Sequence, residues 1–237
     1  IMGGGFMIFT TDKTLCREIL TGEGIYQVFA HPNALWLFGP KNLIYMPKEP
    51  HKAFRAILSP ALFSKEALVQ YAQAQESVCR RYLQKCADQC KATNQPVDVR
   101  LAFRSMAAAS SQEAFLGPYL TEELRRHLEI DIVTFTMGFL SLPFPYFNSG
   151  LHRAIQAKER IEETIRNMVP QAHEYVKTGK EPRCLMERWC QAIQDVAKEQ
   201  NVDVFDVPYC SDDNMARTVL DFLFAAQDAT NSALAYS

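Results

Sequence analysis

The sequence predicts a mainly α-helical domain with a small amount of β-structure near its start. Long segments repeat apolar residues at positions i, i+3, i+4 and i+7, as helices with one buried face do. Most of these segments follow a Ser, Thr or Asp residue, whose side chain can accept hydrogen bonds from the first turn of a helix. The short apolar run Phe6–Thr10 has the pattern of a buried strand instead. With 237 residues, of which 48% are hydrophobic, the chain can bury one core of ordinary size.

The first elements combine one short helix with one irregular stretch. Asp12 can cap a helix at Lys13–Leu20, which Gly22 and Gly24 end. The segment Ile25–Lys48 then interleaves aromatic residues with proline and glycine. Because long irregular loops inside a domain usually carry function, we expect a functional loop there.

Helices are predicted along the rest of the chain. Pro50 suits the first turn of a helix that begins at His51 and stops before Pro60, because proline disfavours helical geometry in the residue before it. Further breaks are predicted at Asn94–Gln95–Pro96 and at Gly117–Pro118. The other predicted helices are Lys65–Lys91 after Ser64, Val97–Leu116, Glu122–Leu140 after Thr121, Gly150–Lys177 with a kink at Pro170, Glu181–Asn201 and Asp213–Ser237 after Ser211 and Asp212.

Composition excludes some classes of function. The chain carries 25 basic and 27 acidic residues, a net charge of −2, which argues against a nucleic-acid partner. Its seven cysteines are scattered on predicted helices without metal-site spacing, so we expect reduced core thiols and no metal centre. The chain opens on Ile1, without a start methionine, a signal peptide or an apolar run long enough to cross a bilayer, and we expect both ends to be cut from a longer sequence.

The last predicted helix has a polar cluster after a wholly apolar stretch. Gln227, Asp228, Thr230 and Asn231 follow Phe222–Ala226 directly. An unpaired buried carboxylate or amide costs a few kcal/mol, so a ligand against this helix is one interpretation. The other interpretation is a core helix whose polar side chains reach a neighbouring backbone group or water.

Two further features each have two interpretations. His51 and Arg55, four residues apart, project from one helix face and suit a carboxylate ligand, or they are a solvated cation pair. The apolar stretch Phe139–Phe147 is either a packed proline turn or a surface for ligand access or membrane contact.

Three motifs resemble segments of the cytochrome P450 family, and they occur along the chain in the same order as in that family. F-L-F-A-A-Q-D-A-T, Phe222–Thr230, resembles its central oxygen-binding helix, and the A-A-Q-D-A form is similar to the sterol 22-desaturase branch. L-F-G-P-K-N-L-I-Y-M, Leu37–Met46, followed by H-K-A-F-R and by Ser59–Ser64, resembles the helix that holds the haem carboxylates. The stretch Leu142–Ile161 resembles the region where a long helix with basic residues begins.

The resemblance implies a haem-dependent oxidoreductase that acts on a sterol or another apolar small molecule, with sterol 22-desaturation as the expected reaction. It implies an iron-containing haem, NADPH-derived electrons through cytochrome P450 reductase, and a place on the cytoplasmic face of the endoplasmic reticulum membrane, where the full-length protein contacts the membrane surface. By the same resemblance, the cofactor-binding residues are His51, Arg55, Ala225 and Ala226, the catalytic residues are Asp228, Thr230 and Gln227, and the substrate-contacting residues are Phe224 and Ala229.

Proton delivery is a separate expectation, because Ala229 stands where the family usually has threonine. Asp228 and Thr230 lie roughly 200° apart around a helix, so one of them faces away from the haem unless the helix widens locally. We expect Asp228, with Gln227 or water, to relay protons and Thr230 to hold the distorted turn.

The departures from the family pattern indicate an incomplete domain. No cysteine stands in the F-x-x-G-x-x-x-C-x-G setting of the axial ligand, and the Glu-x-x-Arg helix is missing. Residues 1–237 are therefore expected to be the amino-terminal part of one domain, truncated before the haem-ligand cysteine region and inactive by themselves. One alternative is a non-catalytic α-helical protein that binds an apolar ligand. A hydrolase that uses Asp228 with His51 or His173 is a third, without a supporting nucleophile motif.

Overall fold

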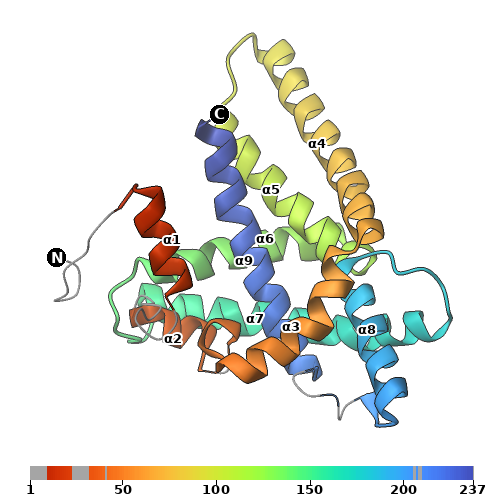
Figure 1. Cartoon of the computed structure of the whole chain (residues 1–237). Coiled ribbons are helices and arrows are strands. Elements are labelled where there is room, and N and C mark those ends of the chain that lie inside the picture. Colours follow the sequence, from red (N-terminus) through yellow and green to blue (C-terminus); the bar gives the residue numbers. More distant parts are fainter. Residues whose placement is uncertain (1–9, 23–31, 41, 205–206, 208–209, 237) are drawn as a thin grey trace. The chain divides into compact units, whose positions relative to one another are not determined.

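The computed structural model describes residues 10–22, 32–40, 42–204, 207 and 210–236, without the side chains of Asp228, Ala235 and Tyr236 (Figure 1). The chain forms two compact units, residues 1–31 and 32–237. Within the described ranges every regular element is helical, which confirms the predicted mainly α class. The predicted strand Phe6–Thr10 falls outside them except for Thr10.

The described part of the first unit is helix α1, Lys13–Thr21. Its amino-terminal cap is the predicted one, because the Asp12 side chain accepts a hydrogen bond from the Leu15 N–H at 2.7 Å. The helix ends at Gly22, as predicted, and buries none of its residues.

The second unit begins at Pro32 and contains the remaining elements. They are α2 (Pro32–Phe38), the 3₁₀ turn η1 (Leu43–Tyr45), α3 (Lys48–Phe63), α4 (Lys65–Thr93), α5 (Val99–Phe115), the 3₁₀ turn η2 (Gly117–Tyr119), α6 (Glu122–Phe139), α7 (Gly150–Lys177), α8 (Leu185–Gln200) and α9 (Asp212–Tyr236). Ser64 and Thr121 cap α4 and α6 as predicted, each accepting a hydrogen bond from the backbone N–H three residues later. Ser211 does the same for Asn214 at the start of α9.

Two predictions in the first half of this unit were wrong. Helix α2 forms inside the segment predicted to be irregular, because Ala34, Leu37 and Phe38 are buried where α2 packs on α6 and α7. Helix α3 continues through Pro60, which costs one backbone hydrogen bond. Burial of Leu58 and Leu62 on either side of the proline offsets that cost.

Two helices begin later than predicted, because a side chain accepts a hydrogen bond from a backbone N–H group near the start of each. Helix α5 begins two residues later than predicted, because the Asp98 side chain accepts a hydrogen bond from Arg100 and caps it. Helix α8 begins at Leu185 rather than Glu181, since Cys184 adopts an extended backbone and the Arg183 N–H donates to the Glu187 carboxylate. Helix α7 continues through Pro170.

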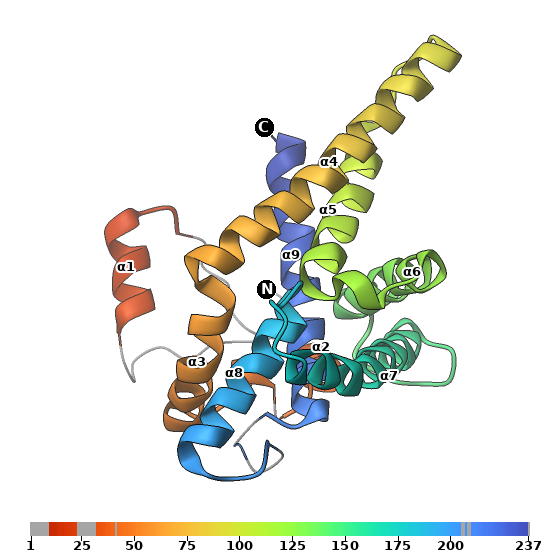
Figure 2. The ribbon, with the colours of Figure 1, turned by 90° about the vertical axis from the view of Figure 1, so that its right-hand side faces the viewer.

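The core of the second unit surrounds α9. Helix α9 packs against α5 and α7, while α6 packs on α7, α4 on α5, and α8 on both α3 and α7. Figures 1 and 2 show α9 running through this unit with α5 beside it. Its side chains Met215, Ala216, Val219 and Leu223 are completely buried. The amino-terminal half of α9 is therefore the core helix that its apolar sequence predicts.

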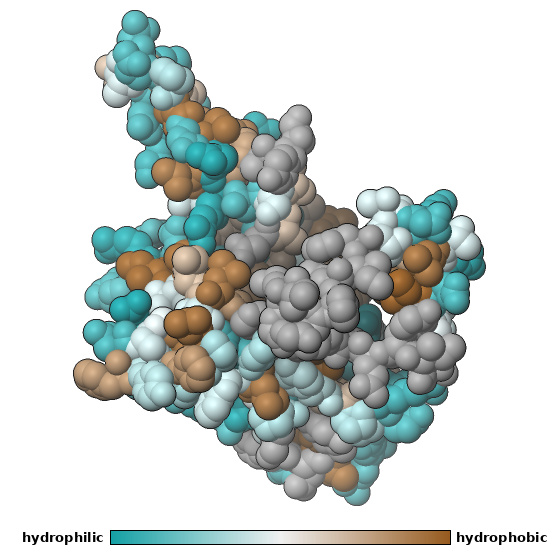
Figure 3. Space-filling view, turned by 90° about the vertical axis from the view of Figure 1, so that its left-hand side faces the viewer, coloured by the Kyte–Doolittle hydropathy of each residue, from teal (hydrophilic) through white to brown (hydrophobic). Residues whose placement is uncertain are grey.

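Helix α4 is less buried than its apolar stripe suggests. Only Ala67 and Val78 are buried along its length, and Leu68 and Leu83 are about half exposed. The carboxyl-terminal part of α4 extends away from the other helices of this unit (Figure 2) and carries both hydrophobic and hydrophilic side chains (Figure 3). The apolar spacing therefore predicted the helix correctly but not the extent of its burial.

A cluster of four phenylalanines joins α2, α6 and α9. The rings of Phe38, Phe135, Phe139 and Phe224 all lie within 5.0–5.8 Å of one another, measured between centroids. Most pairs meet edge to face, the arrangement that aromatic quadrupoles favour. This phenylalanine cluster fixes the middle of α9 against the end of α6.

Gly138 allows the close approach of α6 and α7. A Cβ atom at Gly138 would overlap the Cβ of Ala154 on α7. The same turn of α6 is held by Asn33, whose Nδ2 donates to the carbonyl oxygens of Gly138 and Ser141 at 2.8 and 2.7 Å. Because the Gly138 carbonyl oxygen accepts from Asn33, a shift of this turn of α6 would break that hydrogen bond.

We predict that Gly138→Ala lowers the free energy of unfolding by about 1–3 kcal/mol, the usual cost of overpacking a core. Chemical denaturation of the protein measures it. Ala154→Gly is the matched test of the cause, because it removes the methyl group that the new Cβ would meet. The double variant should be more stable than the sum of the two single effects predicts. Strictly additive effects would show that the close approach is not the cause.

Candidate functional site

The predicted site lies on the carboxyl-terminal half of α9, which has one open and one buried side. Ala225 and Ala229 are exposed, and because they are four residues apart they lie on one side of the helix. Ser232 and Ala233 continue this side with small exposed residues. The structure thus leaves a row of small side chains uncovered at the A-A-Q-D-A motif.

Gln227 lies on the opposite, buried side of α9. It is 6% exposed, and its Nε2 has no hydrogen-bond partner. The structure therefore does not bring Gln227 together with Ala225 and Ala229. Asp228 is part of the helix, but its side chain lies outside what the structure describes.

Ala226 and Thr230 line a pocket of about 260 Å³ between α4, α5 and α9. Cys79, Met106 and Phe115 contribute to its walls. Thr230 is exposed there, and α9 is a continuous α-helix through this region without a widened turn. The distorted turn that Thr230 was expected to hold is thus not present in this structure.

Phe224 belongs to the phenylalanine cluster. Its ring stacks on Phe139 at 5.0 Å and meets Phe38 edge to face at 5.5 Å. Packing accounts for this side chain, and its contact with a substrate stays a prediction.

His51 and Arg55 project from α3. His51 is partly buried, and Arg55 is exposed without an ion pair or hydrogen bond to any described residue. Helix α3 itself packs on α8, where the Phe54 and Trp189 rings meet edge to face at 5.7 Å. The guanidinium of Arg55 is thus available to an acidic ligand.

Sequence reasoning missed a polar contact between Asn42 and Asp221. The Asn42 Nδ2 donates to both carboxylate oxygens of Asp221, at 2.8 and 2.7 Å. Burial raises the pKa of Asp221 to about 7; the Asn42 hydrogen bond opposes this shift, Glu162 adds to it and Lys158 opposes it. The signal in the sequence was an aspartate inside the apolar run V-L-D-F-L.

The buried cysteines are thiols at neutral pH. Burial raises the pKa of the Cys184 thiol to about 12 and that of Cys210 to about 11, and it raises the pKa of Cys190 as well. A metal-ligating cysteine must be a thiolate, which burial in apolar surroundings disfavours. Among the described residues, no group of three or more His, Cys, Asp or Glu side chains is placed to hold a metal ion.

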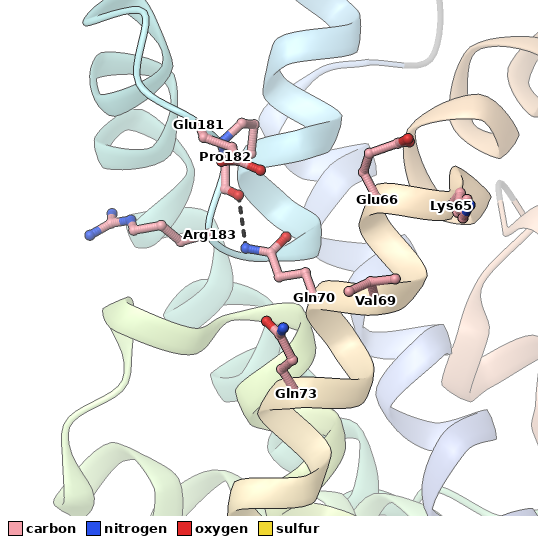
Figure 4. Close-up of a pocket in the computed structure, with 8 residues that line it drawn as sticks. All are labelled: Lys65, Glu66, Val69, Gln70, Gln73, Glu181, Pro182 and Arg183. Carbon is pink, nitrogen blue, oxygen red and sulfur yellow. Dashed lines mark hydrogen bonds between the residues drawn. The ribbon is translucent and has the colours of Figure 1, made fainter.

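A wide groove of about 640 Å³ lies elsewhere, between α4 and the segment Glu181–Arg183 (Figure 4). Gln70 spans it, donating from Nε2 to the Pro182 carbonyl oxygen at 2.8 Å. Arg183 is engaged by the Glu187 carboxylate. The groove contains none of the predicted site residues, so the candidate site remains the open side of α9 and the α3 cations.

Comparison with known proteins identifies the family. The family model for cytochrome P450 matches residues 1–237, the whole chain. The chain belongs to the cytochrome P450 family.

Curated relatives of this cytochrome P450 chain include sterol enzymes. It is 30% identical to cytochrome P450 710A2 of Arabidopsis thaliana over 236 residues, which cover 99% of this chain and 46% of that protein. It is 26% identical to the C-22 sterol desaturase ERG5 of Saccharomyces cerevisiae over 234 residues, which cover 96% of this chain and 43% of that protein. The chain thus spans less than half the length of these relatives.

A solved structure supports the fold. The structure of retinoic acid bound cyanobacterial CYP120A1 matches with a TM-score of 0.69 at 18% identity and covers 93% of this chain and 46% of that one. The arrangement of helices is thus that of the amino-terminal portion of the cytochrome P450 fold. No helix of the described segments is long and apolar enough to span a membrane.

The residues present fit the haem that a cytochrome P450 implies. Ala225, Ala229, Ser232 and Ala233 give the open side of α9 a row of small side chains, which leaves room for a flat ring system. The unpaired Arg55 guanidinium suits a carboxylate, with His51 on the same helix face. Neither feature is needed for packing, since α3 is anchored by Phe54 and α9 by its buried side.

Proposed function

We propose that the whole protein is a haem-dependent cytochrome P450 that introduces a double bond at carbon 22 of a sterol side chain. The observation that carries the proposal is the uncovered row of small residues at the A-A-Q-D-A motif on α9. Similarity to C-22 sterol desaturases supports the substrate class. The activity is proposed for the whole protein, because this chain spans under half the length of those relatives.

The overall change is the removal of two hydrogen atoms from adjacent side-chain carbons. Two electrons from NADPH and two protons accompany them, and one molecule of oxygen becomes two molecules of water. When bound, the haem supplies the oxygen chemistry. We assign electron delivery to a cytochrome P450 reductase and place the full-length protein at the cytoplasmic face of the endoplasmic reticulum membrane.

The cofactor and the substrate would be held by α3 and α9. His51 and Arg55 would bind the haem carboxylates, and Ala225 and Ala226 would allow the ring to lie close to the α9 backbone. Phe224 and Ala229 would contact the sterol. The exposed side chains Leu140, Leu142 and Phe147, 76–91% exposed, form the surface that we assign to membrane contact.

Proton movement falls to Asp228 in this proposal. A carboxyl group can hold and release a proton, whereas Ala229 has no polar group to offer. Gln227 would assist after a change of rotamer, because its side chain is buried on the other side of the helix. Thr230 would stabilise the local helix geometry beside the α4–α5 pocket.

We propose that residues 1–237 form one incomplete domain, without the cysteine that ligates haem iron. The full-length protein should therefore give the carbon monoxide complex typical of a thiolate-ligated haem, and this chain supplied with haem should not. The full-length protein, reconstituted with reductase, NADPH and a sterol with a saturated side chain, should yield a product two hydrogen atoms lighter by mass spectrometry. A full-length protein that binds sterol but gives no thiolate spectrum would instead be a non-catalytic binder.

A second prediction separates the two α3 residues in the full-length protein. Arg55→Ala should reduce haem content more than His51→Ala, because a guanidinium forms two parallel bonds to a carboxylate where imidazole forms one. Each charge-assisted bond contributes about 1.5–3 kcal/mol. Haem quantified per protein measures the effect, with the exposed Lys52→Ala on the same helix as control. Haem content equal to the parent in both variants would remove these residues from the site.

A third prediction concerns the polar cluster of α9 in the full-length protein. Asp228→Asn should lower product formation on the order of 10²-fold, since a general acid commonly contributes that much, while sterol binding is kept. Electrons from NADPH should then appear as hydrogen peroxide. Thr230→Val should instead disturb helix geometry and sterol binding together.

The ratio of sterol product to NADPH consumed, beside a sterol-binding titration, measures both effects. Full coupling in Asp228→Asn, with loss of coupling in Thr230→Val alone, would reverse the two roles.

A further inference from the structure

The contact between Asn42 and Asp221 is built with both ends of the asparagine amide fixed. Asn42 is 3% exposed, and its Oδ1 accepts a hydrogen bond from the Ile44 N–H at 2.9 Å, which caps η1. Its Nδ2 is thereby directed at the Asp221 carboxylate, and it donates to both oxygens. Because the amide is engaged at both ends, the contact has one geometry rather than many.

Asp221 lies on the same row of α9 as the candidate site. It precedes Ala225 by four residues and Ala229 by eight, so the three side chains follow one another along one side of the helix. The carboxylate is thus the last polar group on this row before the uncovered small residues begin.

Asn42 lies on the segment that leads into α3. Helix α3 begins at Lys48, separated from η1 by Met46 and Pro47, and carries His51 and Arg55 in its first turns. Asn42, Asp221 and the buried Phe54 of α3 adjoin one small cavity of about 10 Å³. The contact therefore joins the start of α3 to the row on α9 at a point where packing is otherwise provided mainly by α8.

The charged groups around Asp221 come from α7 and α9. Lys158 and Glu162 of α7 lie 3.6 Å apart, between Nζ and Oε1, and Glu162 is buried. Arg217, one turn earlier on α9, lines the same small cavity. None of these groups donates a hydrogen bond to the Asp221 carboxylate, so Asn42 is its hydrogen-bond donor among the described residues.

We propose that Asp221, through Asn42, is a positioning residue that sets where α3 stands relative to the open row of α9. This inference rests on the proposed haem site, and it names a residue of that site beyond those that the motif predicts. Asp221 acts at a distance: it holds Asn42, Asn42 holds η1, and η1 sets the start of the helix that presents Arg55. Loss of the contact would let the start of α3 shift, and with it His51 and Arg55, while the later part of α3 stays packed on α8.

The test uses the full-length holoprotein and measures the rate at which haem transfers to an excess of a haem-free globin. Asp221→Ala should release haem about tenfold faster, since loss of one charge-assisted hydrogen bond corresponds to at least a tenfold change in an equilibrium. Asp221→Asn keeps an acceptor for the Asn42 amide, so its rate should lie near that of the parent. Glu159→Gln, an exposed carboxylate on α7, is the matched control and should have no effect.

A double-mutant cycle separates positioning from general destabilisation. If Asp221 acts through α3, then Asp221→Ala should add little to haem release once Arg55→Ala is present. If Asp221→Ala instead destabilised the whole fold, it would accelerate haem release by the same factor with and without Arg55→Ala. Asn42→Asp alone removes the donor and sets two carboxyl groups against each other, so it should release haem faster. Adding Asp221→Asn to it restores one amide-to-carboxylate bond and should return the rate toward that of the parent.

The outcomes are distinguishable. A parent protein that binds no haem contradicts the proposed function. An Arg55→Ala variant that releases haem at the parental rate removes Arg55 from the proposed haem site, and the positioning role falls with it. If Arg55→Ala accelerates release but Asp221→Ala does not, or if the two effects add fully, the proposed function stands and the positioning role is wrong. Circular dichroism and thermal unfolding of each variant show that the compared proteins are folded.

Discussion

The other helices of the second unit are arranged around the completely buried side of α9. Met215, Val219 and Leu223 occupy that side, and α5 and α7 pack on it. Apolar burial contributes roughly 25 cal/mol per Å² removed from water, so these side chains fix the rotation of the helix. With that rotation, Ala225 and Ala229 lie on the exposed side of the carboxyl-terminal half of α9, opposite the buried Gln227. In the amino-terminal half the same side is covered as well, since Thr218 is buried.

Buried polar groups around this core are held by specific partners. Glu187 is fully buried, and its carboxylate accepts from the Arg183 side chain and from the Tyr119 hydroxyl at 2.6 Å. Arg183 in turn lies over the Tyr175 ring at 3.7 Å. This network ties α8 to α7 and η2, because breaking a buried ion pair leaves an uncompensated charge. Asp221 differs, since it is paired with a neutral amide and keeps a pKa near 7.

The two carboxylates, Glu187 and Asp221, lie at different contacts between helices. Glu187 lies on α8, which also packs on α3 through the Phe54–Trp189 contact. Asp221 sits where α3 and α9 approach each other, between the cations of one helix and the open row of the other. A cofactor held between two helices requires both their rigidity and their relative placement. The positioning role proposed for Asp221 concerns the second of these requirements.

Local signals in the sequence were sufficient for most helices. Capping residues such as Asp12, Ser64 and Thr121 act within one turn, so their effect is visible without knowledge of the fold. The same is true of the A-A-Q-D-A-T and H-K-A-F-R motifs, which were sufficient for the family that the comparison confirmed. The roles assigned to individual site residues remain predictions, because they depend on groups beyond the described chain.

Long-range packing decided what local signals could not. Helix α2 forms because Leu37 and Phe38 have α6 and α7 to bury against, and α3 continues through Pro60 because Leu58 and Leu62 are buried around it. The partner of Asp221 lies 179 residues away in the sequence, so no spacing rule reveals it. The sequence by itself determined most of the helices, the family and the motif positions, since these depend on neighbours along the chain. Only the tertiary structure decided which side of α9 is open and which carboxylate joins it to α3, because burial depends on residues that are distant in sequence and adjacent in space.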